Sequence, residues 1–415
     1  MFLEFDKDCL GAASIAQVHR AVLADGREVA VKVQRPNVVP MLLGDVANLK
    51  SFSLKLRDKL PVDYYTVFSE LGRALEYELD FLHEAQAAEK VVAAVSHTTS
   101  GIAAPPSIKV PLPIKGLAST RVMVMEYIKG TPLSKLKEEM ERRGLDANSP
   151  ESKLLGRRLL KALTEAYARM IFGSGFVHGD PHPGNIFIME GGAPALIDCG
   201  QVKQLPTSFR KKLAESVVTV ARYIQAFEKG DQAACRDLVP ELADAVRMFG
   251  VTVNDEVREN GRVAEDECLA AVALLLFGTP EVDLPGGYSH SELSNESPIK
   301  KIGSFPQELV MLGRATVLIK GLASRLNIPW SLADKWMEPC LEAIECGEEG
   351  CAVPVWASVD YEVGSTDTDA DVGVGGASPS RARFLEVRSS FRNTRKVFRR
   401  WLSGRGKVIG TGAYN

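Results

Sequence analysis

The sequence has no long apolar run and no paired cysteine motif. Its longest apolar stretch, CLAAVALLLFG at residues 268–278, is shorter than the roughly 18 residues that a bilayer-spanning helix needs, so we expect a buried helix. The seven cysteines include no Cys-x-x-Cys pair, and the spacing of Cys340, Cys346 and Cys351 matches no zinc signature. We therefore expect reduced thiols. The opening MFLEFDKDCL resembles neither a signal nor a transit peptide, so no targeting segment is visible.

Acidic and basic residues are distributed unevenly along the chain. Its 415 residues are 45% hydrophobic and 25% charged, which is typical of a soluble globular protein of one large or two medium domains. The net charge is −3, yet residues 380–407 hold ten Lys or Arg against one Glu, so the remainder carries −12. Just before this basic tail, residues 351–380 become acidic and rich in Gly and Ser, and we expect a flexible linker there.

The basic tail also carries an apolar stripe. Phe384, Val387, Phe391, Phe398 and Trp401 recur at spacings that place them on one side of a helix flanked by arginines. This pattern predicts an amphipathic helix over 381–407 that binds an anionic membrane surface or a partner protein. A solvated tail, or a helix docked on the acidic body of the chain, is the alternative. Nucleic acid is not expected as a partner, because the acidic remainder would repel phosphates.

The rest of the chain predicts a small β-rich lobe followed by a helical lobe. Alternating runs in the first 35 residues, joined at Asp25-Gly26, predict a β-hairpin. Periodic apolar positions predict helix over 40–96 and 151–173, and mainly helix from Thr207 onward. Short strands are expected at 120–130 and on both sides of a Gly-Gly turn before residue 200. The predicted fold is thus α+β and two-lobed, with lobes at 1–130 and 131–350.

The stretch GFVHGDPHPGNIF, residues 175–187, concentrates polar side chains between strands and helices. Three interpretations compete. His178, Asp180 and His182 could ligate a hydrolytic metal ion, Asp180 and Asn185 could serve phosphoryl transfer, or the segment could be a simple Pro/Gly turn. The rest of the chain has to decide between them.

Phosphoryl transfer explains the largest number of features. It needs a cation for the phosphates, a carboxylate that holds this cation, magnesium ligands and an acid that orients the nucleophile. Lys32 in VAVK, Glu84 on the next helix, the pair Asp180 and Asn185, and Asp198 in LIDCG supply these groups in order. Oxygen atoms of Asn185 and Asp198 suit Mg²⁺. A zinc site would leave Lys32 and Asp198 unexplained, so we expect the two histidines to fix the loop by hydrogen bonds.

With these motifs in place, the chain resembles the AarF/UbiB/ADCK group of atypical, protein-kinase-like enzymes over roughly residues 1–345. The resemblance implies a two-lobed kinase-like fold that binds ATP or ADP with Mg²⁺. It also implies a role in isoprenoid-quinone (ubiquinone) or prenyl-lipid metabolism, with lipid-biosynthesis proteins as partners, in bacteria, mitochondria or plastids. The matching stretches are LGAASIAQVHRAVLADGREVAVKVQRP (10–36), ELDFLHEA (78–85), VMVMEYIKG (122–130), FVHGDPHPGN (176–185) and LIDCG (196–200).

The resemblance also assigns further site residues. It places an alanine-rich nucleotide loop near the N-terminus, a hinge at Glu126 to Ile128, and an E-x-D motif at Glu78 and Asp80. His178 and His182 belong to its H-G-D-P-H-P-G-N motif. The nucleotide-loop residues are Gly11, Ala12, Ala13, Ser14, Ala16 and Gln17.

Three departures from the family pattern carry expectations of their own. Gly11 stands where alanine is usual, so the nucleotide loop is expected to be more mobile. The helical extension with a K-x-G-Q motif that covers the family's active site is expected to be missing from this sequence: either the sequence is a fragment, or the gene lacks the extension and Glu78 has lost its partner. Cys199 replaces phenylalanine after Asp198 and offers less apolar surface for packing.

The segment after Asp198 bears on the substrate. Thr207 or Ser208 is a candidate helix N-cap, so little chain remains for a platform that would hold a protein substrate. We therefore expect ATP hydrolysis or phosphorylation of a small or lipid molecule. A nucleotide-binding regulatory module and a protein Ser/Thr kinase remain alternatives. The expected location is an organelle or the bacterial cytoplasm, at the membrane periphery.

Overall fold

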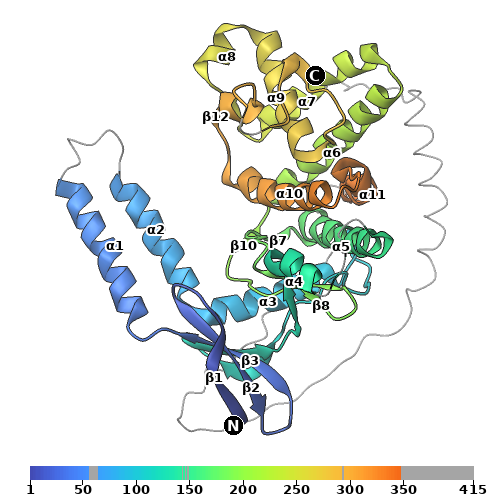
Figure 1. Ribbon diagram of the computed structural model, residues 1–415. Helices are drawn as coiled ribbons and strands as arrows, with labels where there is room; N and C mark the ends of the chain where they lie inside the picture. Colours follow the sequence, from blue (N-terminus) through green and yellow to red (C-terminus); the bar gives the residue numbers. More distant parts are fainter. Residues whose placement is uncertain (56–63, 143, 145, 147–148, 292–293, 347–415) are drawn as a thin grey trace, which may run out of the picture. The chain divides into compact units, whose positions relative to one another are not determined.

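The computed structural model describes residues 1–55, 64–142, 144, 146, 149–291 and 294–346 (Figure 1). The predicted linker (351–380) and the predicted tail helix (381–407) lie outside the described residues. No helix within the described part is long and apolar enough to cross a membrane.

A five-stranded antiparallel sheet forms the N-terminal lobe, in the strand order β1-β2-β3-β5-β4 (Figure 1). The predicted hairpin at Asp25-Gly26 is confirmed, because it joins β2 to β3. Gly26 has φ 87°, a conformation that glycine adopts without a steric penalty. The Arg27 N–H donates to the Asp25 carboxylate (3.1 Å), which stabilises the turn. The strands are β1 (Phe2–Ala12), β2 (Ala16–Leu23), β3 (Glu28–Gln34), β4 (Pro113–Ala118) and β5 (Val122–Glu126).

Alternation along β3 divides its side chains between the two faces of this sheet. Ala30 lies in an apolar cluster with Phe81 and Met125, whereas Val29 and Val31 belong to a second cluster. Phe81 is the first residue of the helix that covers the face on which Ala30 lies. The side chains of β3 on the same face as Ala30 are therefore placed against this helix.

The helical pattern over 40–96 forms three helices. Asp80 caps the third, since its carboxylate accepts the Leu82 N–H (2.9 Å). Nine residues of this third helix are buried, whereas the second helix has no buried residue and lies alongside the first (Figure 1). The third helix therefore packs onto the lobe, and the first two form a hairpin. The helices are α1 (Val38–Lys55), α2 (Tyr64–Glu78) and α3 (Phe81–Val95).

Helix α5 (Pro150–Ala168) leads to the central loop, and its end differs from the prediction. The helix was expected to continue to residue 173, but Arg169–Ser174 forms a π-helical turn (η3). The buried Arg169 donates to the Pro105 carbonyl (2.8 Å), which ties this turn to the segment after α3. Gly175 ends the turn with φ 73°, a left-handed conformation that favours glycine.

Short strands carry the central loop. The two strands predicted around a Gly-Gly turn are confirmed as β8 and β9, and both turn glycines, Gly191 and Gly192, have positive φ. β6, β8 and β9 form one small sheet, and β7 pairs with β10. These strands are β6 (Gly130–Pro132), β7 (Phe176–His178), β8 (Ile186–Met189), β9 (Pro194–Leu196) and β10 (Val202–Gln204).

The C-terminal lobe is mainly helical, as predicted. The apolar run at 268–278 lies in α9, nine of whose residues are buried, so the expectation of a buried helix is confirmed. Trp336, which is 0% exposed, donates to the Thr164 carbonyl (2.9 Å) and fixes α11 against α5. The larger helices after the central loop are α6 (Thr207–Glu228), α7 (Gln232–Met248), α9 (Arg262–Phe277), α10 (Gln307–Arg325) and α11 (Leu332–Glu345). The smaller elements are η2 (Leu133–Lys135), α4 (Leu136–Arg142), β11 (Thr252–Val253), α8 (Asp255–Glu259), η4 (Pro285–Gly287), η5 (Pro298–Lys301) and β12 (Ile302–Ser304).

Two local expectations were wrong. Thr207 and Ser208 do not cap α6: Pro206 occupies the N-cap position without a side-chain cap, and the Thr207 hydroxyl accepts from Arg210 instead (3.0 Å). Cys346 is in a disulfide, although we expected reduced thiols throughout. Among the residues that the structure describes, the free cysteines are Cys9, Cys199, Cys235, Cys268 and Cys340.

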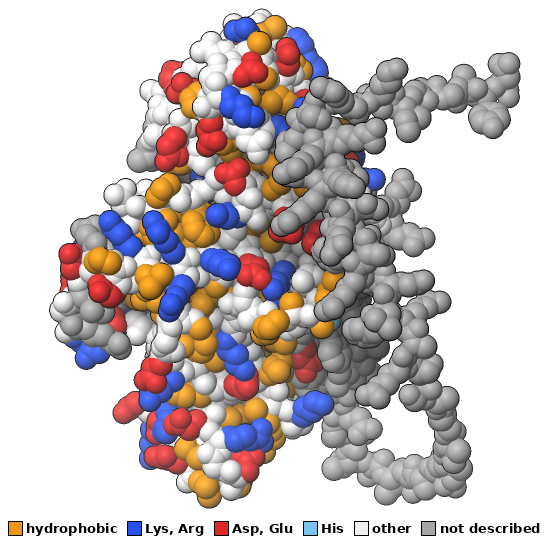
Figure 2. All heavy atoms as spheres, turned by 90° about the vertical axis from the view of Figure 1, so that its right-hand side faces the viewer, with side chains coloured by type: hydrophobic (Ala, Val, Ile, Leu, Met, Phe, Trp, Pro, Cys, Tyr) orange, Lys and Arg blue, Asp and Glu red, His pale blue; other side chains and the backbone are white. Residues whose placement is uncertain are grey.

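The outer side of α5 is basic. It carries Lys153, Arg157, Arg158 and Lys161, none of which forms an ion pair with another residue of the described part. Lys and Arg side chains gather across the middle of the face shown in Figure 2. The side of α5 that carries these four residues is therefore positively charged.

Candidate active site

The centre of the candidate site is an ion pair between β3 and α3. Lys32 Nζ lies 2.7 Å from both carboxylate oxygens of Glu84. The side chains of Lys32 and Glu84 are only 12% and 7% exposed, and the Phe81 ring lies beneath the ammonium, 5.2 Å from its centroid. The structure thus brings together the predicted phosphate-binding lysine and its carboxylate partner.

Burial and charge oppose each other in this pair. Desolvation raises the pKa of Glu84 to about 6 although the Lys32 ammonium favours the ionised form. For Lys32, desolvation alone would lower the pKa, but Glu84 and Asp198 outweigh it, so the pKa of the ammonium is raised. Lys32 therefore stays charged, which binding to phosphate requires.

Asp198 lies on the other side of Lys32. Its Oδ2 is 3.6 Å from Lys32 Nζ, and its Oδ1 accepts the Gly200 N–H (2.9 Å). Desolvation would raise the pKa of this carboxyl, but Lys32 and the Gly200 N–H outweigh it, so the pKa is lowered. The side chain is 41% exposed, so an ionised carboxylate is accessible to a cation.

Consecutive hydrogen bonds hold the loop from Asp180 to Asn185. The Asp180 carbonyl accepts the His182 N–H (2.7 Å) and the Asn185 side-chain amide (3.4 Å), and the His182 carbonyl accepts the Asn185 N–H (2.8 Å). The Asn185 carbonyl accepts the Ile197 N–H (2.9 Å), which brings Asn185 next to the strand that precedes Asp198. The Asp180 carboxylate has no hydrogen-bond partner among the described residues, so it is available for a nucleophile.

Both histidines make hydrogen bonds within the loop region. His178 is buried, and its Nε2–H donates to the Asp198 carbonyl; burial lowers the pKa of His178, which favours the neutral ring. His182 Nδ1 accepts the Gly184 N–H (3.0 Å). These nitrogen atoms are therefore engaged in fixing the loop. No group of three His, Cys, Asp or Glu side chains that could hold a metal ion occurs among the described residues.

Gln201, which we did not single out from the sequence, connects both parts of the site. Its side-chain amide donates to Glu78 (3.0 Å), and its carbonyl accepts the Gly179 N–H (2.8 Å). Glu78 therefore has a hydrogen-bond partner within the described part of the chain. The only signal in the sequence was the position of Gln201 immediately after Asp198-Cys199-Gly200, where the backbone follows the carboxylate that is predicted to bind the metal ion. Asp80 of the same E-x-D motif is the cap of α3 and lies 3.3 Å from His83.

The predicted nucleotide loop connects β1 and β2. Gly11 and Ala12 end β1, Ala13 and Ser14 form the turn, and Ala16 and Gln17 begin β2. The Ala13 N–H donates to the Ala16 carbonyl (2.9 Å), and the Arg35 guanidinium donates to the Ala13 carbonyl (3.0 Å). Gly11 has no positive φ, and a Cβ there would meet nothing within 4 Å. Its backbone therefore does not require glycine.

The predicted hinge follows β5. The Glu126 N–H donates to the Leu112 carbonyl (3.0 Å), and its carboxylate accepts the Leu112 N–H (3.0 Å) and Lys109 (2.6 Å). These contacts fix the end of β5. Among the described residues, the backbone N–H and C=O of Ile128 have no partner, so they are free for the edge of a base.

Residues 1–226 match the family model of the ABC1 atypical kinase-like domain. The chain is 37% identical over 342 residues to AarF domain-containing protein kinase 1 of Xenopus tropicalis, covering 79% of this chain and 58% of that relative. It is 33% identical over 226 residues to the protein ACTIVITY OF BC1 COMPLEX KINASE 1, chloroplastic, of Arabidopsis thaliana, covering 52% of this chain and 30% of that relative. The chain therefore spans 58% or less of these relatives.

Among solved structures, the chain is similar to the complex of Rv3197 with erythromycin from Mycobacterium tuberculosis. The sequences are 24% identical, the match covers 79% of this chain and 78% of that chain, and the TM-score is 0.48.

Proposed function

Because the chain belongs to the ABC1 atypical kinase-like family, we propose that it binds ATP or ADP with Mg²⁺ between its two lobes and transfers or hydrolyses the terminal phosphoryl group. The observation that carries this proposal is the buried Lys32–Glu84 pair with Asp198 beside it. In phosphoryl-transfer enzymes, a lysine held by one carboxylate binds the phosphates, and a second, accessible carboxylate binds their metal ion. Lys32, Glu84 and Asp198 have this arrangement.

Each residue has a distinct role in this proposal. Lys32 contacts the phosphates, and Glu84 holds its ammonium in place. Oxygen atoms of Asn185 and Asp198 would hold magnesium, which neutralises charge on the phosphates when bound. The donor set fits a hard cation, because both side chains offer oxygen and Asp198 is accessible and ionised. Asp180 orients the attacking water or hydroxyl, since its carboxylate has no hydrogen-bond partner among the described residues.

The segment after Asp198 supports a small or lipid substrate. Only residues 201–206 separate Gly200 from α6, and three of them form β10, which pairs with β7. This segment is too short to form the long platform on which protein kinases bind a peptide. We accordingly favour ATP hydrolysis or phosphorylation of a prenyl lipid or related small molecule over protein phosphorylation.

The cellular setting is inferred by analogy with relatives. Support for an organelle comes from the Arabidopsis thaliana relative, whose name includes the word chloroplastic. A role in quinone or prenyl-lipid metabolism at a membrane periphery follows from the family resemblance, as do lipid-biosynthesis partners. A nucleotide-binding regulatory module without turnover is the second candidate, favoured if the purified chain binds nucleotide but releases no ADP.

Thermal unfolding with and without MgATP tests the binding part. Nucleotide should stabilise the wild type only when magnesium is present, because a ligand bound to the folded state raises stability. Asp198→Ala should abolish this stabilisation, and the surface control Glu256→Gln on α8, where the Glu256 side chain is 66% exposed, should keep it. An unchanged shift in Asp198→Ala would contradict the proposal.

Turnover is tested separately by ADP release. Asp180→Asn should lower the rate strongly and leave nucleotide-dependent stabilisation largely intact, because Asp180 acts on the nucleophile. Asp198→Asn provides the inactive reference. Stoichiometric zinc in the purified chain, with activity lost to a zinc-selective chelator, would instead favour the hydrolytic metal site.

A further inference from the structure

Arg35 contacts the predicted nucleotide loop from the end of β3. Its backbone N–H donates to the Ile15 carbonyl (2.9 Å), and its side-chain Nε–H donates to the Ala13 carbonyl (3.0 Å). The two contacts lie on either side of Ser14, so they restrain the tip of the loop at two points. Arg35 forms no ion pair with a described residue, so no carboxylate in that part of the chain competes for its guanidinium.

The backbone from which Arg35 reaches the loop is itself fixed. The preceding residue, Gln34, is buried, and its side-chain amide donates to the Leu79 carbonyl and to the Thr120 carbonyl (3.1 Å). The Gln34 N–H also donates to the Arg121 carbonyl (3.0 Å). These bonds join the end of β3 to the α2–α3 junction and to the turn before β5. The end of β3 is therefore a rigid support for the Arg35 side chain.

The Ala13 carbonyl and the Ser14 N–H belong to the same peptide unit. A peptide unit is planar and trans, so these two groups point in opposite directions. Because Arg35 binds the Ala13 carbonyl, the Ser14 N–H points away from Arg35. This N–H has no hydrogen-bond partner among the described residues, so the loop offers a free donor on the side opposite to Arg35.

Alternation along β3 indicates which side this is. Lys32 and Gln34 lie two positions apart and share one face of the strand, where the Phe81 ring lies beneath the Lys32 ammonium. Arg35 follows one position later, so its side chain departs from the opposite face. The side opposite to Arg35 is therefore the side of Lys32, the residue expected to contact phosphates.

We propose that Arg35 is a positioning residue for nucleotide binding: by holding the Ala13 carbonyl, it directs the Ser14 N–H toward the phosphates that Lys32 contacts. This inference rests on the proposed nucleotide-binding function. A backbone N–H that is already oriented adds a hydrogen bond to a phosphate without reorganising the loop. The bond is made equally to the bound nucleotide and in the transition state, so Arg35 sets the affinity for nucleotide and leaves kcat unchanged.

Two substitutions separate the hydrogen bond of Arg35 from its charge. In Arg35→Gln, the amide nitrogen takes the position of the arginine Nε and keeps the donor, but the charge is lost. In Arg35→Met, a methyl group takes this position, and both donor and charge are lost. Calorimetric titration with MgADP should show an affinity about three- to tenfold lower in Arg35→Met and about two-fold lower or less in Arg35→Gln, with kcat for ADP release unchanged in both. Equal losses in the two variants, or no loss in Arg35→Met, would overturn the proposal.

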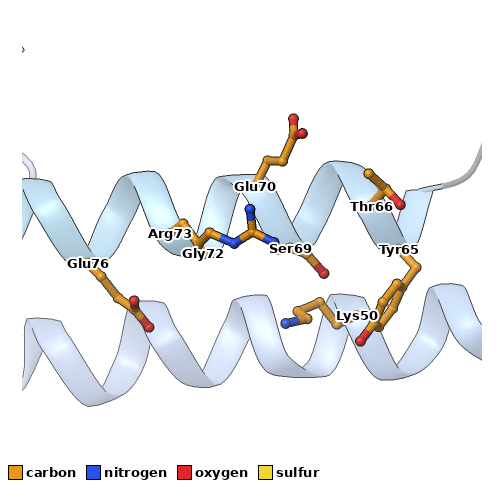
Figure 3. A pocket seen from close by; sticks show the side chains of 8 residues that line it. All are labelled: Lys50, Tyr65, Thr66, Ser69, Glu70, Gly72, Arg73 and Glu76. Atoms are coloured by element: carbon orange, nitrogen blue, oxygen red, sulfur yellow. The ribbon is translucent and has the colours of Figure 1, made fainter. Parts of the chain in front are cut away.

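Arg73→Met is a matched control for the loss of one positive charge. Figure 3 shows the Arg73 side chain pointing into the space between α1 and α2, and no residue of the nucleotide loop lines the cavity there. Like Arg35, Arg73 forms no ion pair with a described residue. Arg73→Met should therefore bind MgADP as tightly as the wild type. A loss as large as that in Arg35→Met would show that only net charge matters and would refute the positioning role.

Hydrogen exchange in the nucleotide-free chain distinguishes a failure of this inference from a failure of the proposed function. The Ala13 N–H, which donates to the Ala16 carbonyl (2.9 Å), should exchange about threefold faster or more in Arg35→Met than in the wild type or Arg35→Gln, because the loop then opens more readily. Equal exchange in the three chains would refute restraint of the loop by Arg35, whether or not nucleotide binds. A wild type that binds no MgADP would refute the proposed function, and the positioning role with it, even if exchange were faster in Arg35→Met.

Discussion

Replacing Glu84 with glutamine tests how the buried Lys32–Glu84 pair is balanced. The two side chains are 2.7 Å apart and almost fully buried, so attraction and desolvation are both large. The raised pKa of Glu84 implies that desolvation prevails and that the folded chain favours the protonated carboxyl more than the unfolded chain does. Glutamine resembles this protonated carboxyl in shape and is neutral at every pH.

The sign and size of the effect follow from the pKa of Glu84. The ordinary pKa is 4.5 and the pKa in the folded chain is about 6. Stability from this group is therefore fully present below pH 4.5 and is lost as the pH rises through 6. The loss is about 2 kcal/mol, because each pKa unit corresponds to about 1.4 kcal/mol. Glu84→Gln lacks this loss, so its unfolding free energy should exceed that of the wild type by about 2 kcal/mol near neutral pH, and by almost nothing at pH 4.5.

Urea denaturation across this pH range measures the difference between the two chains. Glu126→Gln is the control, because the Glu126 side chain, which pairs with Lys109 (2.6 Å), is 39% exposed and the pair should contribute about 1 kcal/mol or less. Nucleotide-dependent stabilisation should decrease in Glu84→Gln, since Lys32 loses its charged partner. A variant that is less stable near neutral pH by about 3–5 kcal/mol would refute the reasoning, because attraction would then exceed desolvation.

Three further predictions concern other residues of the two lobes. Gln201→Ala should lower turnover with little change in nucleotide binding. The double variant Glu78→Gln with Gln201→Glu exchanges donor and acceptor and should restore turnover. A double variant as slow as Gln201→Ala would contradict a positioning role for Gln201. Gly130→Ala should lower the unfolding free energy by about 1–3 kcal/mol, because its Cβ would lie 2.7 Å from a carbonyl oxygen of the facing strand β8. Gly11→Ala, with open space around its Cβ, should change it by about 0.5 kcal/mol or less, and equal losses in urea denaturation would count against this packing argument. Burial lowers the pKa of His178 from its ordinary value of 6.5. The stability that depends on the neutral ring is therefore fully present above pH 6.5 and is lost as the pH falls through the pKa of the folded chain. In His178→Gln, the unfolding free energy should fall less steeply toward acid pH than in the wild type.

Local sequence determined the features that depend on neighbouring residues. The β2–β3 hairpin could be predicted because Asp25-Gly26 supplies both the side-chain acceptor and the positive φ that its turn requires. The types and order of Lys32, Glu84, Asp180, Asn185 and Asp198 indicated phosphoryl transfer, because few reactions need this combination. The structure then places Lys32 next to both Glu84 and Asp198.

Only the tertiary structure decided which distant groups meet and what burial does to them. Gln201 and Glu78 are 123 positions apart, and no periodicity relates them, because their contact depends on how the two lobes pack. The π-helical turn that follows α5 contains Arg169, which donates to the Pro105 carbonyl 64 positions away. The pKa of Glu84 depends on desolvation by side chains from several elements. The sequence by itself determined which chemical groups are present and in what order, and packing determined their partners and their charge, because both depend on contacts between residues far apart in the chain.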